Sequence, residues 1–121
     1  MKAASLFILV FFLWTLAGYG QDSREAEKIQ FLISSVETLQ GAKFIRNGKA
    51  YEARRAADHL RFKLKAAGDQ VKTAEDFIRL CASRSSLSGE PYRIRFSDGK
   101  SVEAEIFFRD RLKHFPGGKI P

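Results

Sequence analysis

The sequence predicts an α+β fold: a helix-dominated small single domain with a short β-hairpin and one further strand. Three observations predict it. Apolar residues recur at helical spacing in three segments, an Asn-Gly dipeptide separates two short runs with aromatic and aliphatic residues, and a later run alternates between apolar and charged residues. We expect this domain at 21–115, between a signal peptide at 1–20 and a flexible C-terminal tail at 116–121.

The first twenty residues, MKAASLFILVFFLWTLAGYG, have the order of a secretory signal peptide. One positive residue, Lys2, precedes a largely apolar run, and small residues follow it. The run is shorter than the about 20 apolar residues that a membrane span needs, although an uncleaved membrane anchor is the alternative. Cleavage after Gly20 and cleavage after Ala17 both fit. We therefore predict a periplasmic or secreted protein with no membrane span after signal removal.

The first two helices are predicted from stripes of apolar residues. The first begins at Asp22 or Ser23, either of which can cap it, and ends at Gly41. The second covers 52–68, where alanines and leucines line one side and Gly68 is a natural stop.

The third helix is predicted at 73–83. Thr73 and Asp76 have the spacing of a capping box, with Asp in the place usually taken by Glu or Gln. Cys81, the one cysteine, lies in the apolar row of this helix, so we expect a small buried side chain and no nucleophile. A single thiol allows no internal disulfide, so the core must hold the fold alone.

The strands are predicted on either side of the third helix. Asn47 and Gly48 both tolerate the positive φ that a two-residue type I′ hairpin turn requires. Residues 92–96 alternate apolar and charged side chains, as in a half-buried strand. We expect the hairpin and this strand to form a small sheet.

The segment 101–115 carries two periods at once. One set alternates as in a returning strand: Val102, Ala104, Ile106 and Phe108. Another keeps helical spacing: Ala104, Phe108, Leu112 and Phe115. Acidic residues early and basic residues late favour a helix, but whether 101–108 is strand or helix stays open.

The amino-acid composition and net charge indicate which kinds of partner the protein can bind. The net charge is +7, or +6 without Lys2, which favours acidic partners such as an acidic glycan or another envelope protein. The alternative is that the lysines and arginines only keep the helix faces soluble. The absence of a clustered basic run favours this alternative over a dedicated site for polyanions. An exported protein is not expected to meet nucleic acid. One cysteine and two scattered histidines do not have metal-site spacing, and no Gly-rich phosphate loop appears, so no cofactor is expected.

Two segments, FIRNGKAYEARRAADHLRFK and TAEDFIRLCASRSSLSGEPY, carry a resemblance. Their pattern is an aromatic residue before Arg-Asn-Gly, then His-Leu-Arg-x-Lys, Thr-Ala-x-x-Phe-Ile and a Ser-rich segment ending in Ser-Gly-x-Pro-Tyr. Here these are Phe44, Arg46-Asn47-Gly48, His59-Leu60-Arg61 with Lys63, Thr73-Ala74 with Phe77-Ile78, and Ser83 through Tyr92. The chain resembles the YfeK-like family of small exported bacterial proteins over about two thirds of its mature length. The resemblance implies an exported bacterial protein of unknown function and carries no catalytic residues over.

The serine-rich stretch ASRSSLSGEPY, at 82–92, has two interpretations. It follows a helix C-terminus, whose negative partial charge disfavours anions, and short hydroxyl side chains satisfy backbone groups in tight connections. We therefore favour a helix-to-strand connection. The alternative is a recognition loop with arginines beside it. The candidate ligand-binding residues on that interpretation are Arg46, Asn47, His59, Arg61, Arg84, Ser85, Ser86 and Tyr92.

These observations favour a non-catalytic binding or envelope-associated module with a basic surface. The alternative is a small hydrolase that uses His59 and a serine of the 83–88 loop, although no G-x-S-x-G motif is present. A third hypothesis is an accessory or inhibitor role between proteins, with no pocket. A pocket that holds His59 within hydrogen-bond reach of a loop serine would favour the enzyme.

Overall fold

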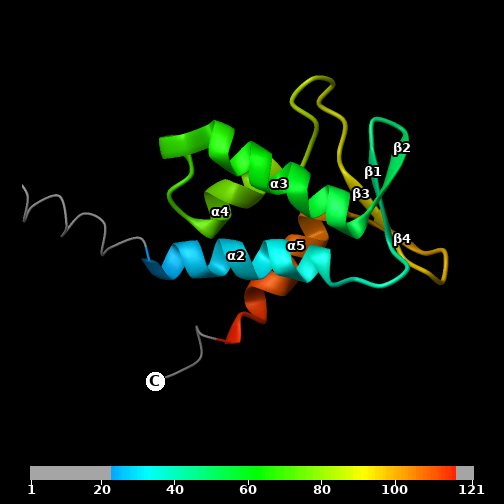
Figure 1. The fold of residues 1–121 in the computed structure, drawn as a ribbon, viewed down its shortest axis with the longest axis horizontal. Helices are drawn as coiled ribbons and strands as arrows, with labels where there is room; N and C mark the ends of the chain where they lie inside the picture. The colour runs from blue at the N-terminus through cyan, green and yellow to red at the C-terminus, as the bar shows by residue number, and fades with distance from the viewer. Residues whose placement is uncertain (1–22, 117–121) are drawn as a thin grey trace, which may run out of the picture.

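The computed structural model describes residues 23–116, which form the predicted α+β domain: helices packed beside a four-stranded antiparallel sheet (Figure 1). The strand order in the sheet is β2-β1-β3-β4. The signal-peptide prediction for 1–20 and the tail prediction beyond Pro116 lie outside the described residues. The elements are α2 (Ser23–Glu37), β1 (Lys43–Arg46), β2 (Lys49–Glu52), α3 (Ala53–Ala67), the 3₁₀ turn η1 (Gly68–Gln70), α4 (Ala74–Phe77), the π-helical segment η2 (Ile78–Ala82), β3 (Arg93–Arg95), β4 (Ser101–Glu103) and α5 (Ala104–Lys113).

Helix α2 is shorter than predicted. It ends at Glu37, whereas the sequence pointed to Gly41 as its end. The backbone N–H and the hydroxyl of Thr38 both bond the carbonyl of Ser34, at 3.0 and 2.8 Å, and close the last turn there. The apolar face of α2 is buried as its spacing predicted, through Ile29, Leu32, Ile33 and Val36.

The hairpin at Asn47 and Gly48 is confirmed. Arg46 pairs with Lys49 across the turn, so the loop has two residues. Asn47 has φ 51° and Gly48 has φ 79°, the positive values that a type I′ turn needs at both central positions. Helix α3 follows β2 directly, and so the hairpin lies against the start of that helix.

The third predicted helix is only partly a regular α-helix. Its capping box is confirmed: Asp76 N–H donates to Thr73 Oγ1 at 3.0 Å, and Thr73 N–H donates to Asp76 Oδ2 at 3.2 Å. After four α-helical residues the backbone widens into η2, which the sequence did not predict. The Ser83 hydroxyl donates to the Ile78 carbonyl at 2.6 Å, a five-residue span that matches the wider π turn.

Cys81 lies in η2 and is 1% exposed, as predicted for a small buried side chain. Burial raises the pKa of its thiol. Low exposure and a raised pKa both lower the reactivity of a thiol.

The ambiguous segment is strand and then helix. Strand β4 runs from Ser101 to Glu103, and α5 begins at the next residue, Ala104. The sheet therefore has a fourth strand, β4, in addition to the two hairpin strands and the strand predicted at 92–96. The strand predicted at 92–96 is β3, which is shorter than predicted and covers Arg93–Arg95. The Ala104 N–H donates to the Tyr92 carbonyl at 2.8 Å and ties the start of α5 to the residue before β3.

The core lies between the sheet and the helices. Ile94 of β3 is fully buried, and it pairs with Phe44 on one side and Val102 on the other. The largest fully buried side chains are Phe77, Phe108, Leu32, Ile33, Ile78, Ile94, Val36 and Cys81. Within residues 23–116, no helix has the length and apolar character needed to cross a membrane.

Candidate functional site

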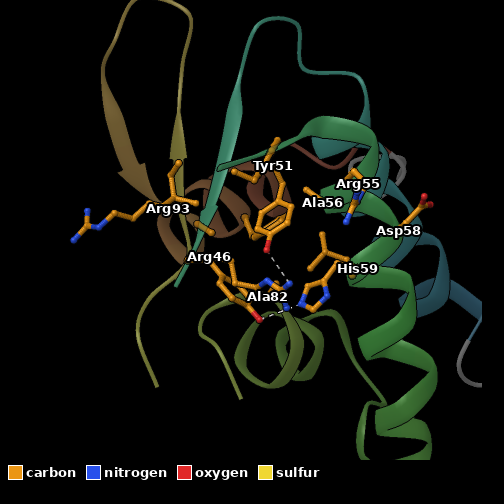
Figure 2. Close-up of a pocket in the computed structure, with 14 residues that line it drawn as sticks. Arg46, Tyr51, Arg55, Ala56, Asp58, His59, Ala82 and Arg93 are labelled. Carbon is orange, nitrogen blue, oxygen red and sulfur yellow. Dashed lines mark hydrogen bonds between the residues drawn. The ribbon is translucent and has the colours of Figure 1, made fainter. Parts of the chain in front are cut away.

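A pocket of about 260 Å³ lies where the β1–β2 hairpin meets helix α3 (Figure 2). Strands, helices and the segment before β3 all contribute to its wall. Its lining residues are Phe44, Ile45, Arg46, Tyr51, Arg55, Ala56, Asp58, His59, Leu60, Ala82, Tyr92, Arg93, Ala104 and Phe108. Three of the candidates from the sequence are among them: Arg46, His59 and Tyr92.

Helical spacing on α3 decides which of its polar residues reach the pocket. Arg55 and His59 are four residues apart and both line it, and Lys63 follows after four more and contacts Tyr92. Arg61 is two residues from His59 and therefore lies on another side of the helix. There it pairs with Glu37 of α2 and with Asp58. Arg61, a candidate ligand-binding residue from the sequence, thus lies outside the pocket.

Two guanidinium groups lie close to the ring of Tyr51 in β2. The guanidinium carbon of Arg46 lies 5.0 Å from the ring centre and that of Arg55 lies 5.8 Å from it. Arg46 Nη2 also donates to the Tyr51 hydroxyl at 3.2 Å, and this hydrogen bond lowers the pKa of Tyr51. Figure 2 shows the Arg46 guanidinium between Tyr51 and His59, and so its charge lies inside the pocket.

Tyr92 links the pocket to α3. Its hydroxyl lies 3.3 Å from His59 Nε2 and accepts a hydrogen bond from Lys63 Nζ at 3.1 Å. Lys63 also donates to the Arg84 carbonyl at 3.2 Å. Because the Tyr92 oxygen already accepts from Lys63, its own proton is available to a neutral His59 ring, which we assign as acceptor at Nε2.

The surroundings of His59 favour its neutral form. Burial lowers the pKa of the imidazole, and the positive charges of Arg46 and Lys63 lower it further. A neutral ring can accept the Tyr92 proton, and so the electrostatics and the hydrogen bond agree.

The pocket has an excess of positive charge. Asp58 is paired with Arg61, and Arg93 lies 3.8 Å from Glu103. In Figure 2 the side chains of Asp58 and Arg93 point away from Tyr51 and His59. Arg46 and Arg55, by contrast, have no carboxylate within 4.0 Å anywhere in residues 23–116. Their two charges are therefore available to an acidic ligand.

Asn47 is placed beside the pocket and not in it. Its side-chain amide donates to the Ser85 hydroxyl at 3.1 Å and its amide oxygen accepts from the Ser88 hydroxyl at 2.5 Å. The hairpin turn is thereby held against the serine-rich stretch, which joins η2 to β3 as predicted. Ser85 and Ser88 thus have a structural role.

Backbone groups of the stretch are also satisfied internally. The Ser85 hydroxyl accepts from the N–H groups of Leu87 and Ser88, at 3.2 and 3.3 Å. Gly89 N–H donates to the Ser85 carbonyl and Glu90 N–H to the Ser88 hydroxyl. An anion-binding nest needs N–H groups that point at the ligand, and these four are already used.

The remaining candidates lie outside the pocket. Ser86 is exposed. The Arg84 side chain is exposed and donates to the Gly89 carbonyl at 3.4 Å. Together with Arg61, these residues do not gather around one site.

The arrangement gives no support to a nucleophile–base pair. His59 is bonded to Tyr92, and among the hydrogen bonds found in residues 23–116 none joins His59 to a serine. The same part of the chain holds no group of three or more His, Cys, Asp or Glu residues that could bind a metal ion.

Sequence reasoning missed Tyr51, Arg55 and Lys63. The spacing Arg55, His59, Lys63 was a usable signal, because residues four apart share a helix face. Tyr51 gave no comparable signal, since its position depends on the register of the hairpin and on how the hairpin meets α3.

Comparisons with known proteins agree with the resemblance in the sequence. Residues 23–116 match the model of a family described as a family of unknown function, DUF5329. The chain is similar to "Uncharacterized protein YfeK" of Salmonella typhimurium, with 34% identity over 85 residues, which are 69% of this chain and 71% of that protein. No solved structure matches the chain.

Proposed function

The chain belongs to the DUF5329 family, and we propose that it is an exported, non-catalytic binding module that holds an acidic ligand in the pocket between the hairpin and α3. The observation that carries this proposal is the pair of guanidinium groups on Tyr51. Arg46 and Arg55 both face that ring, and neither has a carboxylate partner in residues 23–116. Two positive charges that line one pocket and have no acidic partner in the described part of the chain favour the binding of an anion.

The groups around the two arginines support binding over catalysis. The Tyr51 hydroxyl accepts from Arg46, and the Tyr92 hydroxyl is shared by Lys63 and His59. These bonds fix the side chains in place before any ligand arrives, which lowers the entropy lost on binding. A planar guanidinium matches the two oxygens of a carboxylate, and such charge-assisted bonds contribute about 1.5–3 kcal/mol each.

The proposal of export depends on the N-terminal sequence. Residues 1–20 have the order of a signal peptide, with Lys2 ahead of the apolar run. In an oxidising compartment the Cys81 thiol would be shielded from reaction, because the side chain is buried. N-terminal sequencing of the protein from fractionated cells tests this point. We expect a first residue of Gln21 or Gly18 outside the cytoplasm, and an intact Met1 on a soluble cytoplasmic protein would contradict it.

Recovery of a bound acid tests the binding function. The protein is produced with its own leader, purified gently from the compartment that it reaches, and analysed by native mass spectrometry. Arg46→Gln removes one guanidinium from the pocket, and Arg54→Gln is the matched control, since Arg54 is an exposed α3 residue outside the pocket wall. We expect an acidic small molecule on the wild type and on Arg54→Gln, and its loss from Arg46→Gln. The same acid on all three proteins would contradict the assignment to this pocket.

A further inference from the structure

We infer that the acid held by this pocket is an amphipathic carboxylate, in which one carboxylate ends a short aliphatic or aromatic body. The inference rests on the proposed function and adds the chemistry of the ligand. The carboxylate lies at Arg46 and Arg55, and the apolar body lies against the hydrocarbon part of the wall.

The large side chains of that hydrocarbon part come from three different elements. Phe44 of β1, Leu60 of α3 and Phe108 of α5 all line the pocket. The alanines at 56, 82 and 104 complete it, and their short side chains leave space between the larger ones. An apolar ligand body on these side chains is removed from water, which is the main source of affinity in small-molecule pockets.

The polar groups of the wall argue against a sugar acid. The Tyr51 hydroxyl accepts from Arg46, the Tyr92 hydroxyl is bonded by Lys63 and lies at His59, and Asp58 is bonded to Arg61. These polar groups are few, and a sugar ring would place most of its hydroxyl groups against Phe44, Leu60 and Phe108, which have no polar side-chain atoms. Each buried hydroxyl without a partner costs free energy, so a body without hydroxyls fits better.

The volume and the charge of the pocket narrow the class of ligand further. A volume of about 260 Å³ is near the lower end of ligand pockets, which favours a small molecule over a polymer segment. Arg46 and Arg55 line the same pocket without an acidic partner in residues 23–116, and each offers a planar fork of donors that fits a carboxylate. They also exclude an amine of the same shape, because its charge repeats theirs.

Octanoate tests the inference directly. Backbone amide and Tyr ring signals of the processed protein are followed by NMR during titration with octanoate, with glucuronate as the sugar acid and with octylamine as the cation of equal chain length. We expect saturable shifts with octanoate at Tyr51, His59 and Tyr92. We expect glucuronate to bind at least about tenfold more weakly, because it loses the apolar contact and buries hydroxyls. Octylamine should give no saturable shifts at these residues.

Two variants link the shifts to the pocket. Arg46→Gln should weaken octanoate binding by about tenfold or more, whereas Arg54→Gln should leave it unchanged. The amide spectrum of each variant shows whether it is folded, and Arg55→Gln replaces Arg46→Gln if the latter does not fold.

Each contrary result has a distinct meaning. Glucuronate binding at Tyr51 and His59 as tightly as octanoate, with the same loss in Arg46→Gln, overturns the amphipathic ligand but keeps the acidic pocket. Octylamine binding there as tightly as octanoate overturns the role of the charges. If neither acid shifts these residues, both this inference and the proposed pocket are wrong.

Discussion

Asn47 is the residue through which the hairpin turn contacts the serine-rich stretch, and its replacement tests the structural role of that stretch. Its side chain makes two hydrogen bonds, one with Ser85 at 3.1 Å and one with Ser88 at 2.5 Å. The first is partly buried and the second is exposed. Since a hydrogen bond contributes about 0.5–1.5 kcal/mol net, and the exposed one lies at the low end, Asn47→Gly should cost about 1–2 kcal/mol.

Asn47→Ala separates the side chain from the backbone. Asn47 has φ 51°, which glycine adopts freely and alanine resists. Alanine therefore loses the same two bonds and adds about 1 kcal/mol of backbone strain, for a total of about 2–3 kcal/mol. We therefore expect stability to decrease in the order wild type, Asn47→Gly, Asn47→Ala.

Urea unfolding followed by circular dichroism measures these differences. With a slope of about 1–3 kcal/mol per molar urea, a loss of 1–2 kcal/mol moves the midpoint by roughly 1 M. Lys49→Ala is the control, because Lys49 is exposed on the same hairpin, and it should stay within about 0.5 kcal/mol of the wild type. Equal midpoints for Asn47→Gly and the wild type would refute the contact between the turn and the serines.

Three further predictions concern other parts of the fold. Gly48→Val should lower stability by about 1 kcal/mol or more in thermal denaturation, because φ is 79° and open space around the site leaves backbone strain as the cause; an unchanged melting curve would mean another turn geometry. Cys81 should react slowly with thiol reagents in the native protein and quickly after unfolding, since it is 1% exposed; fast native labelling would contradict its burial. Glu25 accepts from the Ala74 N–H at 2.9 Å, which lowers the pKa of its carboxyl. That stabilisation is present above about pH 4.5 and is lost as the pH falls through the lower folded-state pKa, so the loss of stability in Glu25→Gln should be smaller at pH 3 than at pH 7. An equal loss at both pH values would contradict this prediction.

Local signals predicted the turn and the helix starts well. The Asn47-Gly48 dipeptide predicts the type I′ turn, and Thr73 with Asp76 three residues later predicts the capping box. Both could be predicted because each depends only on residues that are close together in the chain. The segment after Ser101 could not be resolved in the same way. Its two periods share Ala104 and Phe108, and the change from strand to helix at Ala104 also involves a bond to the distant Tyr92.

The candidate site was only partly predictable for a related reason. His59 and Tyr92 are 33 positions apart, and their contact depends on how α3 packs beside the segment before β3. Arg61 was predicted as a candidate too, but it is two residues from His59, and two residues along a helix turn a side chain to another side. Helical periodicity likewise does not reveal the widening at η2, where the Ser83 hydroxyl donates to the Ile78 carbonyl.

The pKa of His59, measured by NMR with and without octanoate, tests most directly whether the pocket holds an acid. In the free protein the pKa should lie below the ordinary value of 6.5, because of burial and the charges of Arg46 and Lys63. A bound carboxylate places negative charge beside the ring and favours its protonated form, so saturation with octanoate should raise this pKa. In Arg46→Gln the free value should be higher than in the wild type, and octanoate should change it little. Saturable octanoate binding to the wild type that leaves the His59 pKa unchanged would place the acid elsewhere and contradict the account.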